Sequence, residues 1–316
     1  MSIQLFNYSV IQLFITWDVA PEIFSIGSFS LRWYTLLFAL AFVFGYFIIR
    51  YIFKREGILN SKLTPLSPSR FSILNSKFTV LDRLSLYMLL GTVIGARLGH
   101  CLFYEPDYYL QNPVEILQTW KGGLASHGAA IGILLALFIF SRTERNSLPA
   151  GEGWGGAYLW LLDRMVIVVA LSCCLIRIGN LMNSEIFGVP TNLFWGFEFV
   201  RSPEWYRPPI SKQPCHPTQI YEALAYLTIF LFLLRKYFTI AKSKVSKLKS
   251  QSNGLLFGIF LVSMFTVRFI IEFIKIDQVS FEKGMLLNMG QLLSLPFIIL
   301  GIYLLCQRNQ VKKENY

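Results

Sequence analysis

Long runs of apolar residues alternate with short polar segments along most of the chain. A helix needs about 20 mostly apolar residues to cross the roughly 30 Å of bilayer hydrocarbon. Seven segments meet this requirement, and we expect each to form a transmembrane helix. They cover residues 31–54, 84–104, 124–142, 157–179, 218–238, 254–274 and 286–306. The pattern therefore predicts an all-α integral membrane protein, a seven-helix transmembrane bundle in one polytopic domain over residues 1–316.

Composition supports this prediction. Hydrophobic residues make up 54% of the chain and charged residues 15%, whereas soluble domains contain about 25% charged residues. A net charge of +11 would suggest a nucleic-acid partner in a soluble protein. In a membrane protein such an excess is typical of basic cytoplasmic loops. We therefore expect a membrane-embedded protein with no nucleic-acid partner.

The distribution of Lys and Arg predicts the orientation of the spans. When loops are assigned alternately to the two sides, the set that includes the C-terminus holds 14 Lys and Arg and the other set holds 6. The positive-inside rule then places the N-terminus outside and the C-terminus inside. The long outer connection 180–217, which is rich in Pro and Trp, is expected to fold as a small periplasmic cap. Segment 55–83 is expected to be a cytoplasmic insertion.

Several ionisable residues are predicted at one depth, in the outer third of the bundle. Charged groups within spans are costly and normally face the protein interior or a watery cavity. The potential cations come from four different spans and are Arg97, His127, Arg177 and Arg268. The same layer contains Tyr34, His216, Glu185, Glu222 and Glu272. Such a group of cations is what an anionic lipid headgroup requires.

Each of these residues also has a plainer interpretation. Arg and His side chains near helix ends can extend to the membrane interface without any ligand. Arg268 and Glu272 are one helical turn apart, so their charges can neutralise each other. Burial can make Arg97 a structural partner of Glu185 or Glu272. Because four separate spans contribute, we favour an anion site over four independent coincidences.

Two further patterns point to polar surfaces near the outer ends of spans. Arg177, Asn180 and Ser184 recur at i, i+3 and i+7, which places a cation and two hydrogen-bonding groups on one helix face. The adjacent glycines Gly122 and Gly123 precede the third span, where their backbone N–H groups can face an anion. Both patterns favour a polar ligand over packing alone.

The run Arg-Ile-Gly-Asn-Leu-Met-Asn-Ser-Glu-Ile-Phe-Gly at 177–188 resembles the signature of the bacterial prolipoprotein diacylglyceryl transferases. Four further blocks resemble the same family and occur in the family's order. They are Arg-Trp-Tyr at 32–34, Gly-Gly-Leu-Ala-Ser-His-Gly at 122–128, His-Pro-Thr-Gln-Ile-Tyr-Glu at 216–222 and Arg-Phe-Ile-Ile-Glu-Phe at 268–273. Together they extend the resemblance over most of the chain.

The resemblance implies an enzyme of the bacterial inner membrane, with its active site towards the periplasm. Such enzymes transfer the diacylglyceryl group of phosphatidylglycerol to the thiol of the lipobox cysteine in prolipoprotein signal peptides. Glycerol 1-phosphate is released in this first step of lipoprotein maturation. The resemblance implies neither a cofactor nor a metal.

The reaction needs a thiolate and stabilisation of negative charge on phosphate, and the resemblance implies which residues supply them. His127 is the candidate base, and Arg177 and Arg268 are candidates for binding the phosphate. Further candidates for binding phosphatidylglycerol are Tyr34, Arg97, Asn180, Asn183, Glu185, Gly188, His216, Tyr221, Glu222 and Glu272. One departure is Cys215, which stands where an arginine usually precedes the His-Pro block. It argues against an ionic role for that position.

A small-solute transporter is the main alternative, because charges within the membrane also mark permeation paths. A transporter places its site near the midplane and is often built from repeated halves. Here the polar residues lie in the outer layer, and we detect no repeat. The sequence therefore favours an enzyme that acts on lipid.

Overall fold

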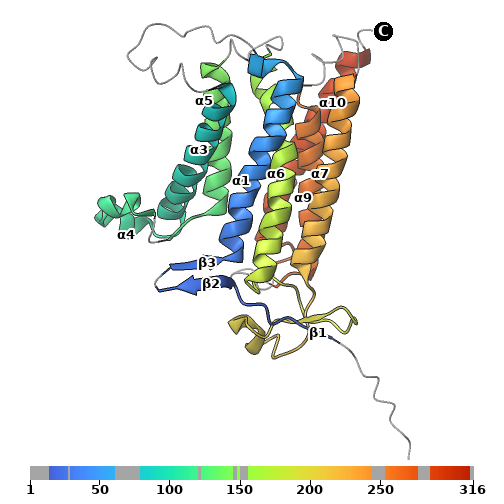
Figure 1. The fold of residues 1–316 in the computed structure, drawn as a ribbon. Coiled ribbons are helices and arrows are strands. Elements are labelled where there is room, and N and C mark those ends of the chain that lie inside the picture. The colour runs from blue at the N-terminus through green and yellow to red at the C-terminus, as the bar shows by residue number, and fades with distance from the viewer. Residues whose placement is uncertain are drawn as a thin grey trace, which may run out of the picture. The chain divides into compact units, whose positions relative to one another are not determined.

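The computed structural model describes residues 14–27, 29–60, 79–119, 122–144, 148–149, 156–242, 253–276 and 285–313. In this part of the chain, seven helices are long and apolar enough to cross a membrane. They are α1 (Trp33–Arg55), α3 (Val80–Phe103), α5 (Ser126–Thr143), α6 (Gly156–Met182), α7 (Thr218–Lys242), α9 (Leu255–Ile271) and α10 (Met289–Lys313) (Figure 1). The predicted helical fold with seven spans is confirmed, and each helix overlaps one predicted range. Most of the predicted insertion 55–83 lies outside the described residues.

Short elements connect the long helices. The strands are β1 (Ile15–Thr16), β2 (Glu22–Ile26), β3 (Phe29–Arg32) and β4 (Phe197–Glu198), and the one short α-helix is α4 (Pro106–Gln111) among the described residues. The 3₁₀ helices are η1 (Ile58–Asn60), η2 (Pro113–Leu117), η4 (Pro203–Tyr206) and η5 (Glu272–Ile274). Strands β2 and β3 are antiparallel and lead into α1, whereas β1 is parallel to β4. We had not predicted these strands, because pairs this short have little sequence pattern.

The chain divides into two compact units. Unit 1 comprises residues 1–42, 169–233 and 259–303, and unit 2 comprises 43–168, 234–258 and 304–316. Helices α1, α6, α7, α9 and α10 contribute residues to both units, whereas α3 and α5 belong to unit 2 alone. The single membrane domain expected from the sequence therefore stays a prediction.

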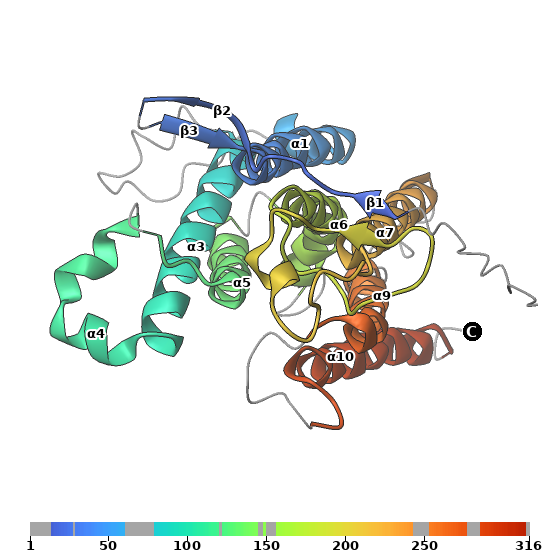
Figure 2. The same cartoon turned by 90° about the horizontal axis from the view of Figure 1, so that it is seen from below.

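In unit 1, the segment that follows α6 folds around an apolar core of its own. The buried members of this core are Leu181, Phe187, Phe197, Phe199, Trp205, Ile210 and Cys215. Strand β4 lies in it and pairs with β1, and the indole of Trp17 donates to the carbonyl of Leu181 at 2.9 Å. Figure 2 shows β1 beside this yellow segment, which lies across the end of α6. The predicted cap thus has a folded core, while its side of the membrane stays a prediction.

In unit 2, α3 and α5 lie side by side through a close approach of glycines (Figure 1). A Cβ atom on Gly95 would lie 2.5 Å from the carbonyl oxygen of Gly128, and one on Gly132 would lie 2.1 Å from that of Gly91. Only glycine fits at such distances, so these residues fix how closely the two backbones pack. The small-residue pattern in these spans therefore serves packing.

Asp163 and Arg164 of α6 have partners in unit 2, which explains how this span tolerates two charges. The Asp163 carboxylate accepts the backbone N–H groups of Gly254 and Phe257 at 2.9 and 2.8 Å. These donors belong to the start of α9, where a negative charge is favourable. Arg164 pairs with Glu56 at 3.1 Å. Both charges thus fasten neighbouring segments together.

Replacing Gly95 with Val should destabilise unit 2. Overpacking costs about 1–3 kcal/mol, and we expect the upper end because the atoms that the new side chain meets are backbone atoms of α5. Thermal unfolding of the purified protein in detergent measures the effect. The control is Ala130→Val, at an exposed position of α5. Equal unfolding midpoints for the two variants would contradict the close packing of α3 against α5.

Candidate functional site

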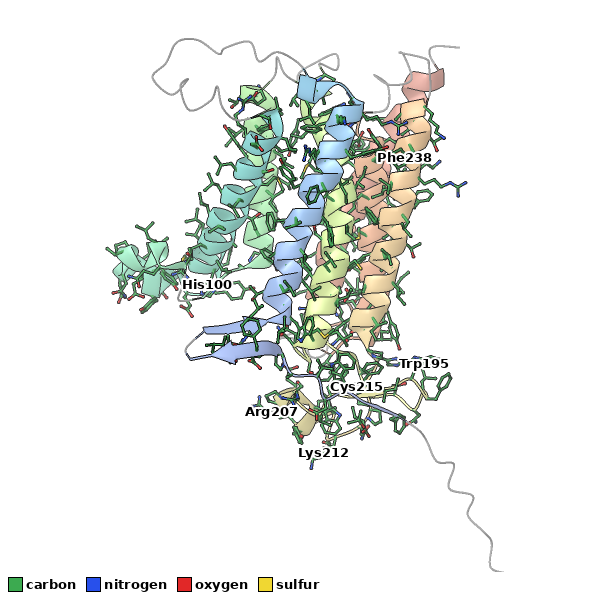
Figure 3. All side chains as sticks on the ribbon, in the orientation of Figure 1. His100, Trp195, Arg207, Lys212, Cys215 and Phe238 are labelled. Atoms are coloured by element: carbon green, nitrogen blue, oxygen red, sulfur yellow. The ribbon has the colours of Figure 1, made fainter. Side chains whose placement is uncertain are left out.

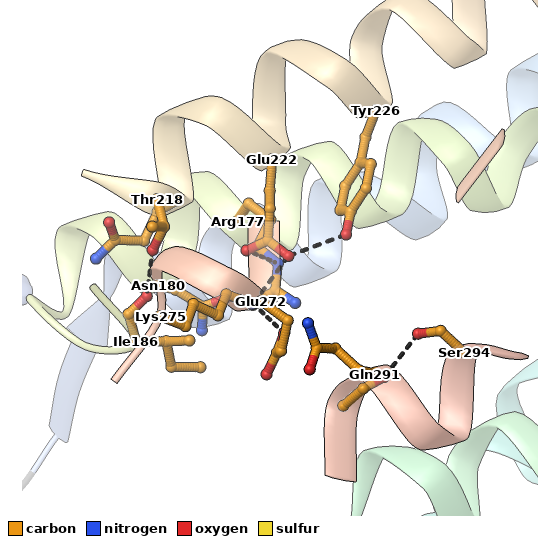
Figure 4. A network of polar contacts seen from close by, with 12 residues as sticks. Arg177, Asn180, Ile186, Thr218, Glu222, Tyr226, Glu272, Lys275, Gln291 and Ser294 are labelled. Atoms are coloured by element: carbon orange, nitrogen blue, oxygen red, sulfur yellow. Dashed lines mark hydrogen bonds and ion pairs between the residues drawn. The ribbon is translucent and has the colours of Figure 1, made fainter. Parts of the chain in front are cut away.

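The carboxylate of Glu222 is the centre of a buried polar network in unit 1 (Figure 4). Its side chain has no exposed surface. One oxygen lies 3.0 Å from Nε of Arg177, and the other accepts hydrogen bonds from Nζ of Lys275 at 3.0 Å and the hydroxyl of Tyr226 at 3.1 Å. Three partners thus compensate the burial of this charge, and removing any one of them would leave the others incompletely paired.

The second acid of the network is Glu272, in η5. Its carboxylate lies 3.3 Å from Nζ of Lys275. The sequence suggested that Glu272 neutralises Arg268, and this expectation is wrong, because α9 ends at Ile271 and the following turn directs Glu272 to Lys275. Arg268 is partly buried and has no hydrogen bond or ion pair with any residue that the structure describes. Its guanidinium group is therefore available to an anion.

A chain of hydrogen bonds extends the network beyond the end of α6. Nη1 of Arg177 donates to the amide oxygen of Asn180 at 3.2 Å. The amide nitrogens of Asn180 and Asn183 then donate to one carboxylate oxygen of Glu185, at 2.8 and 3.2 Å. Four of the residues predicted from the 177–188 block are thus brought together.

The predicted helical face that joins Arg177, Asn180 and Ser184 is only partly correct. Arg177 and Asn180 do share a face and are hydrogen bonded. Helix α6 ends at Met182, however, and Ser184 has a φ of 53°, in the left-handed region. The chain has already turned away from the helix axis at this point, so Ser184 does not continue the face.

The start of α7 holds the turn that follows. Nε2 of Gln219 donates to the carbonyl of Glu185 at 2.7 Å, and the hydroxyl of Thr218 donates to the carbonyl of Ile186 at 2.9 Å. Gly188 donates its N–H to the carbonyl of His216 at 2.8 Å. A Cβ atom at Gly188 would lie 2.4 Å from the carbonyl oxygen of Ile274. Glycine is thus needed here for packing.

Tyr34 and Arg268 lie close to the same network. A Cβ atom on Gly179 would be 2.8 Å from the ring of Tyr34, so the start of α1 packs closely against α6. Tyr34 interacts electrostatically with Glu185 and Arg177. The thiol of Cys173 on α6 interacts electrostatically with both Arg177 and Arg268. The two arginines predicted for phosphate binding therefore lie in the same region of unit 1.

His216 and Tyr221 form a separate pair beside the cap core. Nδ1 of His216 lies 3.3 Å from the hydroxyl of Tyr221, and burial lowers the pKa of His216. The adjacent Cys215 is fully buried in the apolar core, and burial raises the pKa of its thiol to about 12. The thiol thus stays protonated at neutral pH, in agreement with the expectation that this position has no ionic role.

Arg97 belongs to unit 2 and supports the backbone there. Its guanidinium donates to the carbonyls of Ile116 at 2.9 Å, Gly122 at 2.7 Å and Glu115 at 2.6 Å. These partners differ from Glu185 and Glu272, which the sequence had suggested. The carbonyl of Gly122, rather than its N–H, faces the charged group, so the glycine pair contributes to holding Arg97.

His127 lies in the first turn of α5, also in unit 2. Its ring contacts the rings of Phe103 and Tyr104, each with a centroid separation of 5.6 Å. The side chain is exposed, and no described residue forms a hydrogen bond with it. Both ring nitrogens can therefore meet a substrate.

Sequence reasoning missed three members of the network, Tyr226, Lys275 and Gln219. Tyr226 lies four residues after Glu222 and Lys275 three after Glu272, so helical spacing could have identified both. The predicted spans place Lys275 in a loop instead. Gln219 donates a hydrogen bond to the backbone carbonyl of Glu185, 34 residues away, and no local sequence pattern predicts such a contact.

Comparisons with known proteins place this geometry in context. The family model described as prolipoprotein diacylglyceryl transferase matches residues 21–307. A protein of Tolumonas auensis is 40% identical over 289 residues, which cover 92% of this chain and 95% of the relative. A protein of Porphyromonas gingivalis is 43% identical over 299 residues, which cover 92% and 94%. Both relatives are named phosphatidylglycerol-prolipoprotein diacylglyceryl transferase, and the comparisons give the transporter alternative no support.

Replacing Glu222 with Gln should lower the free energy of unfolding by about 3 kcal/mol, because Arg177 would lose its acidic partner and Lys275 one of its two. Thermal unfolding in detergent measures this loss. Asp18→Asn is the control, since Asp18 pairs with Arg201 at 2.6 Å on the surface and exposed pairs contribute less than about 1 kcal/mol. Equal unfolding midpoints for the two variants would show that the network around Glu222 contributes no more to stability than an exposed ion pair.

Proposed function

The chain belongs to the prolipoprotein diacylglyceryl transferase family, and on this premise we propose how its described residues transfer a diacylglyceryl group from phosphatidylglycerol to a prolipoprotein. The acceptor is the thiol of the lipobox cysteine in the signal peptide. The sulfur forms a bond to the terminal glycerol carbon, the bond from that carbon to the phosphate oxygen breaks, and glycerol 1-phosphate leaves with the electron pair. The thiol proton passes to a base.

The observation that carries the proposal is the unpaired guanidinium of Arg268. Arg177 is paired with Glu222, and Lys275 with both Glu222 and Glu272. Arg268 alone among the cations of this network lacks an acidic partner in the described part of the chain. A phosphate diester carries one negative charge and would supply that partner. The planar fork of Arg268 would bind two of its oxygens as charge develops on the leaving group.

Arg177 serves the same phosphate from a fixed position. Glu222 and Asn180 hold its guanidinium in place before any lipid binds. Donors that are positioned in advance need no reorganisation when charge moves to the leaving group. The pair Arg177 and Arg268 would thus combine one fixed and one uncompensated cation.

The remaining residues of the lipid site have supporting roles in this proposal. Some of them would orient the lipid headgroup itself, and others would hold the arginine and lysine side chains that face it. These residues are Tyr34, Asn180, Asn183, Glu185, His216, Tyr221, Glu222 and Glu272. Gly188 and Arg97 shape the backbone, as their contacts indicate.

In unit 2, we assign the role of base to His127. A cysteine thiol has an ordinary pKa of about 8.5, so little thiolate exists at neutral pH without assistance. The exposed imidazole of His127 has no hydrogen-bond partner among the described residues. A neutral imidazole is a suitable acceptor near pH 7.

The proposed location is the bacterial inner membrane, with the cap on the periplasmic side. The excess of Lys and Arg in the opposite set of loops supports this orientation. An impermeant thiol reagent added to whole cells should therefore label a cysteine placed at exposed Lys212. The test uses a background in which the exposed Cys306 is replaced by Ser. Labelling only after cell disruption would reverse the orientation.

The activity itself is tested with a labelled lipobox peptide and phosphatidylglycerol in membranes that contain the protein. In this assay, Arg268→Lys should lower turnover by roughly 10²-fold, because a point charge cannot form the two-oxygen contact. The unfolding midpoint should hardly change, since Arg268 has no partner to lose among the described residues. Arg201→Lys, on the surface, is the matched control. Near-normal turnover of Arg268→Lys would mean that charge alone suffices.

His127→Gln distinguishes a base from a residue that only binds lipid. Loss of the base should lower turnover by roughly 10²–10⁴-fold at neutral pH, with little change in lipid affinity. The defect should shrink as pH rises towards about 8.5, where the thiol ionises unaided. Turnover is measured from pH 6.5 to 9 with saturating lipid and peptide. A defect of constant size would instead assign His127 to lipid binding.

A further inference from the structure

A tight turn in the cap exposes three apolar side chains side by side. The N–H of Gly196 donates to the carbonyl of Leu193 at 2.8 Å and closes the turn. Leu193, Phe194 and Trp195 are 40%, 73% and 38% exposed, and the two rings meet edge to face with centroids 4.6 Å apart. We call Leu193–Gly196 the aromatic turn. Exposed apolar clusters of this kind commonly mark interaction sites.

The aromatic turn is firmly attached to the cap core on both sides. Before it, the N–H of Thr191 donates to the carbonyl of Pro214 at 2.8 Å. After it, Phe197 and the fully buried Cys215 exchange backbone hydrogen bonds of 2.9 Å. A Cβ atom on Gly196 would lie 3.0 Å from Thr191 and 3.1 Å from Pro214. The fold thus holds the apolar tip outward by close packing at its base.

One hydrogen bond places the aromatic turn at the end of a membrane span. Nε1 of Trp195 donates to the hydroxyl of Tyr221 at 2.8 Å. Tyr221 lies in the first turn of α7, and Leu224 and Leu231 follow on the same side of the helix at i+3 and i+10. These leucines are 60% and 55% exposed. Exposed leucines along a transmembrane helix face acyl chains, so the turn extends a lipid-facing surface.

The distribution of charge within the cap also indicates that the aromatic turn faces the membrane. Residues 186–197 include no Asp, Glu, Lys or Arg. Residues 198–212 contain five charged residues, among them Arg207 and Lys212, which Figure 3 shows away from Trp195. A segment free of charge beside a span suits a membrane interface, whereas the charged remainder suits water.

We propose that the aromatic turn inserts into the boundary between lipid headgroups and acyl chains and anchors the cap to the bilayer. Phe194 and Leu193 would enter the apolar layer. Trp195 and Tyr221 would lie at headgroup level, where rings with one polar group are enriched in membrane proteins. The partner of the aromatic turn is thus the lipid of the bilayer. This proposal does not depend on the catalytic roles assigned above.

The test adds a fluorescent reporter at the tip through Phe194→Trp in the full-length protein. The variant and the original protein are reconstituted in phosphatidylglycerol-containing nanodiscs with lipids that carry a nitroxide either near the glycerol or near the chain end. The difference between the two proteins isolates the added indole. We expect it to be quenched about two-fold or more strongly by the shallow nitroxide than by the deep one, and to be little affected by acrylamide.

Tyr206→Trp is the matched control, because Tyr206 is 51% exposed and packs against Lys212 in the charged part of the cap. Its indole should be quenched by acrylamide and not by either lipid. The same behaviour at position 194 would overturn the proposal. So would lipid quenching at position 194 that begins only when a lipobox peptide is added, since the turn would then serve the peptide. Unfolding midpoints near that of the original protein establish that both variants are folded.

Discussion

The carboxylate of Glu222 carries no exposed surface and yet has two cations and a hydroxyl as partners. Moving a charge out of water costs several kcal/mol, so each charge of this cluster depends on the positions of the others. The cluster joins α6, α7 and the turn after α9, three segments far apart in the sequence. Arg177 therefore has a defined position before any ligand arrives, which is the condition for electrostatic catalysis.

In unit 2, close-packed glycines and buried Arg97 fix the position of the segment that carries His127. The glycines of α3 and α5 permit a backbone approach that no other residue allows. At the end of α3, buried Arg97 binds carbonyls of the segment that leads into α5. The start of α5, where His127 lies, is thus fixed by local contacts, while the imidazole itself remains exposed. In each unit, closely packed residues thus surround one side chain that has no hydrogen-bond partner among the described residues, Arg268 in unit 1 and His127 in unit 2.

Much of the fold was accessible from the sequence, because the need to cross hydrocarbon leaves a strong signal. The seven apolar runs predicted seven helices, which the structure confirms. The spacing of Arg177, Asn180 and Ser184 predicted one shared face, and only Arg177 and Asn180 share it, because α6 ends before Ser184. The pairing of charges was not accessible in the same way. Whether Glu272 meets Arg268 or Lys275 depends on where α9 ends, and helix ends are poorly specified by pattern.

The strands escaped prediction, since β1 and β4 have two residues each and β2 and β3 only five and four, too few for a clear periodicity. The cap was expected to fold, but the residues of its core were not identified. Gly188 and Gly196 illustrate a related limit. Gly188 is required because the backbone of Ile274, distant in sequence, approaches it, and Gly196 packs tightly against Thr191 and Pro214. In a single sequence, a glycine can indicate either backbone flexibility or close packing. Only the folded structure shows which of the two roles applies.

We propose that two arginines bind the phosphate of the lipid together: Arg177, held by Glu222, and Arg268, which has no acidic partner among the described residues. An experimental structure of the protein in phosphatidylglycerol-containing nanodiscs tests it most directly. We expect phosphate oxygens within about 3 Å of the guanidinium nitrogens of both arginines, with Glu222 still paired to Nε of Arg177. A bound phosphatidylglycerol whose phosphate contacts neither arginine, or a Glu222 released from Arg177 in the complex, would contradict it.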